Sequence, residues 1–283
     1  MAAAGLVVLK RRIESIKKTR KITRAMALVA TAKLRKCRNL LFSNGLYYDK
    51  VSSVFQDLLK EVHKDNLYVN SPKEGKKLYV VFTSDNGLCG GYNNYLVNKT
   101  KELCKDKNEK VVLCFIGHRG KGEFESLNYN IMSAPCQLSD IPTVEEIKVI
   151  VNHLIEAFKR GEASEINLIY TKFITTVKTE VVVEKLLPLE VDRDEATKEY
   201  IIFEPSLEEV FEEVVKEYLK ERVYYAAILA KSSEHSARMT AMDGATHNAN
   251  DLLGKLQLKY NRIRQSSITQ EISEIVGGSE AHT

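Results

Sequence analysis

The fold of this chain is decided by residues 207–276, LEEVFEEVVKEYLKERVYYAAILAKSSEHSARMTAMDGATHNANDLLGKLQLKYNRIRQSSITQEISEIV. This stretch contains no proline, and its apolar residues alternate spacings of three and four, which is typical of a coiled-coil helix. At about 1.5 Å per residue, one helix of this length spans roughly 100 Å, so it extends beyond any globular domain and requires a partner helix. The spaced apolar residues are Phe211, Val214, Tyr218, Tyr225, Ile228, Met239, Met242, Ala249, Leu253, Leu256, Tyr260 and Ile263.

A second helix with the same spacing is predicted near the N-terminus, over residues 4–58. The positions reached from Leu6 to Leu58 in alternating steps of three and four residues are apolar, except for Arg20, Thr23 and Asn44. Its one internal turn signal, residues 43–45, is weak and indicates at most a local disturbance. All five prolines lie between the two helices. The sequence therefore predicts an antiparallel coiled coil of the two termini, with a folded domain inserted between them.

Several seam positions are polar, which weakens a coiled coil and needs an explanation. They are Arg20, Thr23, Ser232, His235 and Thr246. One interpretation is that these side chains specify the register of the two helices. The other is that this part of the coil is thin and shares much of its surface with a surrounding partner.

The inserted domain is predicted to be an α/β domain with a mainly parallel, Rossmann-like sheet, because apolar strands alternate with helices. The helix that starts after Thr143 has a capping-box pattern, with Glu146 three residues later. We expect strands at 78–82, 110–116, 166–170 and 178–187, helices at 95–103 and 143–159, a linker at 64–76 and a charged loop at 190–200. The predicted domains are an N-terminal coiled-coil helix (1–60), the inserted α/β domain (61–206) and a C-terminal coiled-coil helix (207–283).

Composition is that of an ordinary soluble protein. The 283 residues are 44% hydrophobic and 28% charged, and no apolar run approaches the ~20 residues of a membrane span. The short apolar start, residues 2–9, lacks a basic region and a cleavage-like site, so we expect a mature cytoplasmic chain without a signal peptide. The five cysteines form no C-x-x-C pair and are expected to be buried, reduced thiols.

Charge is unevenly distributed although the net charge is only +4. Residues 10–38 hold twelve Lys or Arg against a single acid, Glu14. A solvated helix face normally mixes charges of both signs, so this one is expected to face an acidic partner. Residues 204–221 hold seven Glu against Lys216 and Lys220. The coil is therefore predicted to be electrostatically polarised along its length.

No catalytic, metal or cofactor site is predicted. Two glycine-rich turns, SDNGLCGG at 84–91 and GHRGKG at 117–122, follow strands, where phosphate loops occur. Neither matches G-x-x-x-x-G-K-[ST] or G-x-G-x-x-G, and tight turns account for the glycines. The six histidines have no ligand spacing with one another. A nucleotide-binding α/β domain with coiled-coil arms remains the alternative to a non-enzymatic role.

Nucleic-acid binding by the basic helix is a second alternative, because bZIP basic regions are also Lys- and Arg-rich helices. In this chain, however, the partner helix belongs to the same chain, and the seam residues Ile13, Ile16, Ala27 and Ala30 interrupt the basic stretch. We therefore expect acidic protein loops, and no nucleic acid, as the partner.

Three long motifs resemble one family. RRIESIKKTRKITRAMALVATAKLRK (11–36) resembles the N-terminal helix of the γ subunit of F-type ATP synthases. TSDNGLCGGYN (83–93) resembles the S-D-x-G-L-C-G-x-x-N loop of that family, and residues 237–278 resemble its C-terminal helix. The resemblance covers nearly the whole chain and keeps the order of the motifs.

The resemblance implies a central rotor shaft that catalyses nothing itself. Its coiled coil would stand in the bore of the α and β subunit hexamer. Its α/β domain would sit with the ε subunit against the membrane ring of c subunits. Rotation would couple H⁺ or Na⁺ flow to ATP synthesis or hydrolysis. The cysteine-bearing regulatory segment of chloroplast members has no counterpart here, which favours the cytoplasmic face of a bacterial cell membrane and peripheral attachment through the complex.

Family roles can be carried over to matching positions. By resemblance, Met26 lies where the shaft meets acidic loops of the β subunit. Residues matching the upper C-terminal helix would contact loops that line the bore. The expected partner contacts are Ile22, Met26, Lys33, Arg238, Arg264, Gln265 and Thr269.

Overall fold

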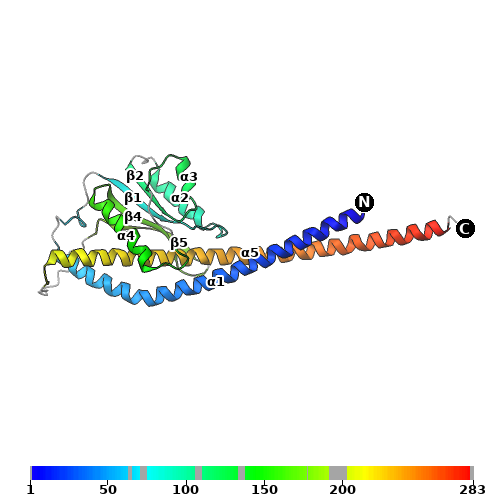
Figure 1. The fold of residues 1–283 in the computed structure, drawn as a ribbon, viewed down its shortest axis with the longest axis horizontal. Coiled ribbons are helices and arrows are strands. Elements are labelled where there is room, and N and C mark those ends of the chain that lie inside the picture. The colour runs from blue at the N-terminus through cyan, green and yellow to red at the C-terminus, as the bar shows by residue number, and fades with distance from the viewer. Residues whose placement is uncertain are drawn as a thin grey trace. The chain divides into compact units, whose positions relative to one another are not determined.

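The computed structural model of the protein describes residues 2–62, 66–70, 75–105, 110–132, 138–176, 178–190 and 203–280. Two long helices dominate it: α1 (Ala2–Glu61) and α5 (Leu207–Glu280) (Figure 1). Both predicted terminal helices are thus confirmed. Much of the predicted linker, most of the predicted 190–200 loop and Cys136 lie outside the described residues.

Helix α1 continues through residues 43–45, so the predicted disturbance there is wrong. The hydroxyl of Ser43 donates a hydrogen bond to the Leu40 carbonyl, 3.2 Å away. The amide of Asn44 donates to Glu221 Oε2 of α5 at 3.1 Å. These turn-forming side chains therefore stabilise the helix and its pairing with α5 instead of a turn.

A five-stranded sheet has the order β3-β2-β1-β4-β5. The strands β1, β2, β3 and β4 run parallel to one another, and β5 is antiparallel to β4, which confirms a mainly parallel sheet. In the register of the central strands, Val80 of β1 lies opposite Cys114 of β2 and Leu168 of β4. The strands are β1 Lys76–Phe82, β2 Val111–Ile116, β3 Ile131–Met132, β4 Ala163–Phe173 and β5 Thr179–Leu187.

Helices pack on both faces of the sheet. One face is covered by α2 (Tyr92–Cys104) and α3 (Lys121–Ser126), and the other by α4 (Val144–Lys159) with the two long helices. The predicted capping box of α4 is present, since Thr143 Oγ1 accepts from the Glu146 N–H and the Glu146 carboxylate accepts from the Thr143 N–H. Strand β3 and helix α3 were not predicted, because two and six residues are too short to show a periodic pattern.

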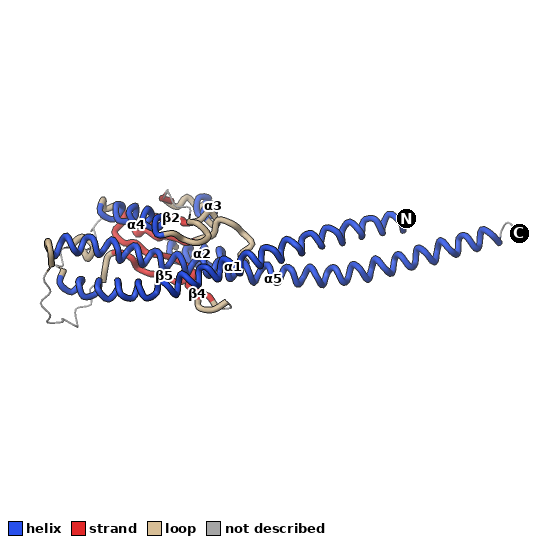
Figure 2. Tube along the Cα trace, turned by 60° about the horizontal axis from the view of Figure 1, so that its bottom comes forward, coloured by secondary structure: helices blue, strands red, loops and turns tan. Residues whose placement is uncertain are grey.

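Alternate residues of β1 enter two separate apolar cores, as the period-2 geometry of a strand requires. Leu78, Val80 and Phe82 point to the core shared with α4, α1 and α5. Tyr79 and Val81 point to the core shared with α2 and α3. Figure 2 shows the strands, in red, beside the long helices in this part of the molecule.

The chain divides into two compact units. Unit 1 consists of Met1–Val29 and Met239–Thr283, and unit 2 is Ala30–Arg238. The sheet, the short helices and both apolar cores belong to unit 2. Both chain termini lie at the same end of unit 1 (Figure 1).

Within unit 1 the two helical segments are antiparallel. Thr23 Oγ1 lies 2.7 Å from Thr246 Oγ1, and Arg20 donates to Asn250 Oδ1 at 3.1 Å, so residue numbers rise in one segment as they fall in the other. These polar residues pair across the seam, which supports the interpretation that they specify register. The predicted antiparallel coil is confirmed.

Candidate functional site

The basic segment of unit 1 presents unpaired positive charge. Lys10, Arg11, Arg12, Lys17, Lys18, Lys21 and Arg24 are all exposed. Among the described residues, none of these side chains forms an ion pair. Exposed apolar side chains lie among these cations and just after them, with Ile22 60% and Leu28 66% exposed, whereas Met26 is half-buried. A helix surface that mixes free cations with exposed apolar groups is typical of a site that binds an acidic protein partner.

The predicted contacts on the C-terminal part of α5 also lie at the surface of unit 1. Arg264, Gln265 and Thr269 are exposed, and the Thr269 hydroxyl donates to the Gln265 carbonyl at 3.0 Å. Exposed Ile268 and Ile272 lie on the same stretch of helix. These side chains are therefore available to a partner that surrounds the helix.

Lys33 and Arg238, in contrast, already have partners within unit 2. Lys33 Nζ lies 2.5 Å from Asp140 Oδ2. Arg238 is only 8% exposed, and it donates to Glu234 Oε1 at 2.7 Å and to the Asn86 carbonyl at 3.0 Å. Their assignment as partner contacts stays a prediction, and the geometry gives both residues a further role inside the chain.

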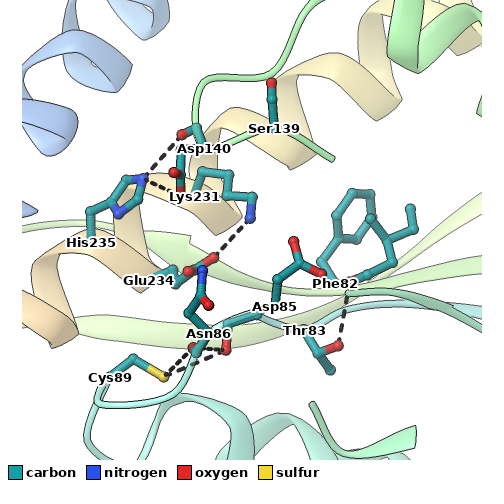
Figure 3. Close-up of polar contacts among 12 residues, drawn as sticks. Phe82, Thr83, Asp85, Asn86, Cys89, Ser139, Asp140, Lys231, Glu234 and His235 are labelled. Atoms are coloured by element: carbon teal, nitrogen blue, oxygen red, sulfur yellow. Dashed lines mark hydrogen bonds and ion pairs between the residues drawn. The ribbon is translucent and has the colours of Figure 1, made fainter. Parts of the chain in front are cut away.

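These two residues belong to an ion network, of which Figure 3 labels Asp140, Lys231, Glu234 and His235. Lys231, Glu234 and His235 are buried, whereas the side chains of Lys33 and Asp140 are half-exposed. Lys231 Nζ lies 3.0 Å from Glu234 Oε2, and both side chains are almost fully buried. Asp140, on the loop before α4, accepts from Lys33 through its carboxylate. Burial raises the pKa of Asp140, but the neighbouring Lys33 ammonium outweighs this effect, so the carboxyl pKa is lowered and Asp140 carries its charge at neutral pH.

His235 is fully buried in this network, and both of its ring nitrogens are used. Nδ1 lies 3.3 Å from Arg238 Nη1, and Nε2 lies 3.0 Å from the Asp140 carbonyl oxygen. Because a guanidinium only donates, Nδ1 accepts and the Nε2–H donates, which defines one neutral tautomer. Burial lowers the pKa of His235 below its usual range, against the opposing effect of the hydrogen bond to Asp140. The ring is therefore neutral at physiological pH.

The grouping of Asp140, Glu234 and His235 has the spacing of a metal site but the wrong surroundings. Their ligand atoms lie within 4.8 Å of one another. Lys33, Lys231 and Arg238 already neutralise the two carboxylates, and the histidine has no free lone pair. These contacts make the group an ion network and disfavour a bound metal.

The two glycine-rich turns lie at the carboxyl ends of β1 and β2, where a nucleotide would bind. One backbone hydrogen bond joins the two turns, since the Arg119 N–H donates to the Ser84 carbonyl at 2.9 Å. The Ser84 hydroxyl also accepts from the amide of Asn93, on α2, at 2.8 Å. Gly117 has φ +107°, and a Cβ on it would lie 2.3 Å from the Thr83 carbonyl oxygen. The glycine here is required by close packing of two loops, which needs no ligand.

Sequence reasoning missed Asp140, Lys231 and Glu234 as members of one cluster. A signal was present on α5, because residues 231, 234 and 238 are charged and follow the apolar run 223–230 with helical spacing. Asp140 gave no such signal, since it lies about a hundred positions away on a loop.

Comparison with known proteins gives consistent matches. A family model described as "ATP synthase" matches residues 5–281. The ATP synthase gamma chain of Clostridium kluyveri is 49% identical over 281 residues, and that of Clostridium novyi is 45% identical over 283 residues; each match covers 99% of both chains.

Solved structures of low sequence identity share the fold. A chain of the rotor of the Euglena gracilis mitochondrial ATP synthase matches 94% of this chain and 99% of its own, with a TM-score of 0.68 and 18% identity. A chain of the central stalk and c-ring structure of the Tetrahymena thermophila mitochondrial ATP synthase matches 79% and 99%, with a TM-score of 0.60 and 24% identity.

Proposed function

The chain belongs to the ATP synthase gamma chain family, and from this premise we propose that it is the central rotor shaft of an F-type ATP synthase. The observation that carries this proposal is the surface of unit 1. Its antiparallel helix pair presents unpaired positive charge and exposed apolar residues, whereas a face that contacts only solvent would have paired charges and few exposed apolar groups. Such a coil fits the bore of a ring of partner subunits.

The partners we propose are the α and β subunits around the coil, and the ε subunit and c ring at the α/β domain. Ile22 and Met26 would meet acidic loops of β, while Arg264, Gln265 and Thr269 would meet the loops lining the upper bore. We retain the division into helices 1–60 and 207–283 and an inserted domain, 61–206, as the functional description of the chain. Lys33 and Arg238 remain proposed contacts, although their charges are engaged within unit 2.

A shaft of this kind acts through differential contact, without chemistry of its own. Each conformation of a β subunit would have a different contact free energy with each face of the coil. Turning the coil would then shift the populations of the three β conformations in sequence. In this proposal, ion flow through the c ring drives the turning and ATP forms in the β subunits, so the chain needs no catalytic residue or cofactor.

We place the chain at the cytoplasmic face of a bacterial cell membrane. The relatives that match over nearly their full length are chains of Clostridium species. Within the described residues, no helix combines the length and apolar character needed to cross a membrane. Membrane association would therefore occur through the other subunits of the complex.

The test is co-purification of a tagged chain from its native membranes, with the bound subunits identified and ATPase activity assayed. Recovery of α, β, ε and c subunits with ATPase activity is the expected result. An isolated chain that itself hydrolyses ATP, or that purifies without these subunits from membranes with an active ATP synthase, would contradict the proposal.

A further inference from the structure

The ion network lies within unit 2, close in the sequence to the positions at which α5 leaves this unit and α1 enters it. Unit 2 ends in α5 at Arg238 and begins in α1 at Ala30. Lys33 lies three positions after Ala30, the first residue of unit 2. Residues 231–238 are the last eight residues of this unit. The fully buried apolar residues that α5 contributes to the first core end at Ala230. Between residues 231 and 238 every buried side chain is polar or charged, and Ala237 packs, partly buried, against the second core.

One tie connects α5 to the glycine-rich turn after β1. Arg238 Nε donates to the Gly87 carbonyl at 3.3 Å, and Nη2 donates to the Asn86 carbonyl at 3.0 Å and to Glu234 Oε1 at 2.7 Å. We call these two side chains and two carbonyls the Arg238 clamp. Because a guanidinium is planar, its donors meet all three acceptors only in one orientation of the turn on the helix.

A second tie connects both helices to the loop before α4. The Asp140 carboxylate binds Lys33 of α1, and the Asp140 carbonyl accepts from His235 of α5. We call this group the Asp140 tie. Together, the two ties connect the turn before α2 and the loop before α4, two helices that pack in different apolar cores, to the same eight residues of α5, 231–238.

A contribution to the stability of the folded chain does not by itself explain why charged residues are buried in this part of α5. Lys231 and Glu234 are 4% and 2% exposed, and burying ions costs desolvation free energy that a well-packed apolar group would avoid. Apolar contacts are non-directional and tolerate sliding, whereas charge-assisted hydrogen bonds fix an orientation. A network of this kind resists twisting of a helix against the domain that surrounds it.

We propose that the Arg238 clamp and the Asp140 tie form the joint through which torque passes between the α/β domain and the two helices. The inference rests on the shaft role proposed above. In it, Glu234, Arg238 and Asp140 are positioning residues that act through the orientation of α5 and α1. Without the joint, the helices twist against the domain under load, and part of each rotational step is lost.

The experiment uses the whole complex in inverted membrane vesicles. ATP hydrolysis and the membrane potential generated by it are measured together, since a voltage-sensitive dye responds to the transport of either H⁺ or Na⁺. The change is Glu234→Gln, which keeps the side-chain shape and removes the charge that orients Arg238. We expect the potential per ATP hydrolysed to fall several-fold while hydrolysis stays near the wild-type rate.

The matched control is Glu213→Gln on the same helix. Glu213 also pairs with a lysine three residues away, Lys216, at 2.8 Å, but this pair lies at the surface. The control should keep the wild-type ratio. A second variant, Asp140→Asn, removes the ion pair with Lys33 at a half-exposed position and keeps the carbonyl that binds His235, so it tests the joint without a buried unpaired charge. We expect a smaller fall in the same ratio.

Two outcomes overturn the proposal: a parallel loss of hydrolysis and potential in Glu234→Gln, which indicates a purely structural role, or a wild-type ratio in Asp140→Asn. If the wild-type complex hydrolyses ATP without generating any potential, the shaft role itself fails. That result is distinct, because it does not depend on the variants.

Discussion

The same two helices are used in opposite ways in the two units. In unit 2, α5 is buried nearly all round between Val223 and Ser236, because the sheet, α4 and α1 surround it. In unit 1, its buried positions reduce to a single stripe that includes Met242, Ala249 and Leu253. A continuous helix can thus serve as the core of a domain in one part and as a surface for other proteins in the next.

The largest effect is expected from shortening a core side chain of α5 in unit 2. Leu219 is fully buried, so Leu219→Ala should lower the free energy of unfolding by about 2–5 kcal/mol, through lost burial and the cavity left behind. The measurement is denaturant unfolding of the purified chain. Leu258→Ala on the same helix in unit 1 is the control, since Leu258 is 72% exposed and its loss should change stability by less than about 0.5 kcal/mol. Equal effects at both positions would remove the distinction between the units.

Reversing the exposed positive charges of unit 1 should weaken binding to partner subunits and leave the stability of the chain nearly unchanged. Changing Lys17, Lys18 and Lys21 to Glu replaces exposed charges that form no ion pair with any residue described in the structure, so the free energy of unfolding should change little. Binding of the chain to the α and β subunits should weaken by about tenfold or more, with a smaller dependence on salt. Reconstitution of the complex at two salt concentrations measures this. Unchanged affinity would show that the basic face does not contact the partner.

The buried histidine predicts a pH dependence specific to unit 2. The folded state holds His235 neutral with a lowered pKa, while the unfolded chain takes up a proton near pH 6.5. Stability due to this group is therefore complete above about pH 6.5 and is lost as the pH falls below it, by at most ~1.4 kcal/mol per pH unit. Unfolding measured between pH 7.5 and 5 checks this. His235→Gln should flatten the curve there, since an amide both donates and accepts without titrating, and an unflattened curve would assign the slope elsewhere.

The smallest effect concerns the register of the coil in unit 1. Thr23→Val leaves the Thr246 hydroxyl without its partner across the seam. The double variant, Thr23→Val with Thr246→Val, removes both hydroxyls. A double-mutant cycle should give a coupling free energy of about 1 kcal/mol, the usual net value of a neutral hydrogen bond. Thermal unfolding of the four proteins supplies the cycle. A coupling near zero would mean that the apolar seam alone sets the register.

Much of the fold could be predicted because its signals are local. The 3–4 spacing predicted both long helices, and the Thr143–Glu146 pair predicted the start of α4. The weak turn signal at residues 43–45 did not produce a turn, because the Asn44 amide hydrogen-bonds to Glu221 on α5 within a continuous helix. Of the surface of unit 1, the excess of positive charge was visible in the sequence, because charge composition does not depend on the fold.

The sequence by itself determined where the longer helices and strands form and which helix faces are apolar, since these follow from side-chain periods of 3.6 and 2 along one stretch of chain. Only the tertiary structure decided that Arg238 holds the turn after β1 and that Lys33 and His235 meet at Asp140. Those residues are separated by about a hundred positions or more. Their pairing depends on which helix face packs against which edge of the sheet, and no local pattern specifies that choice.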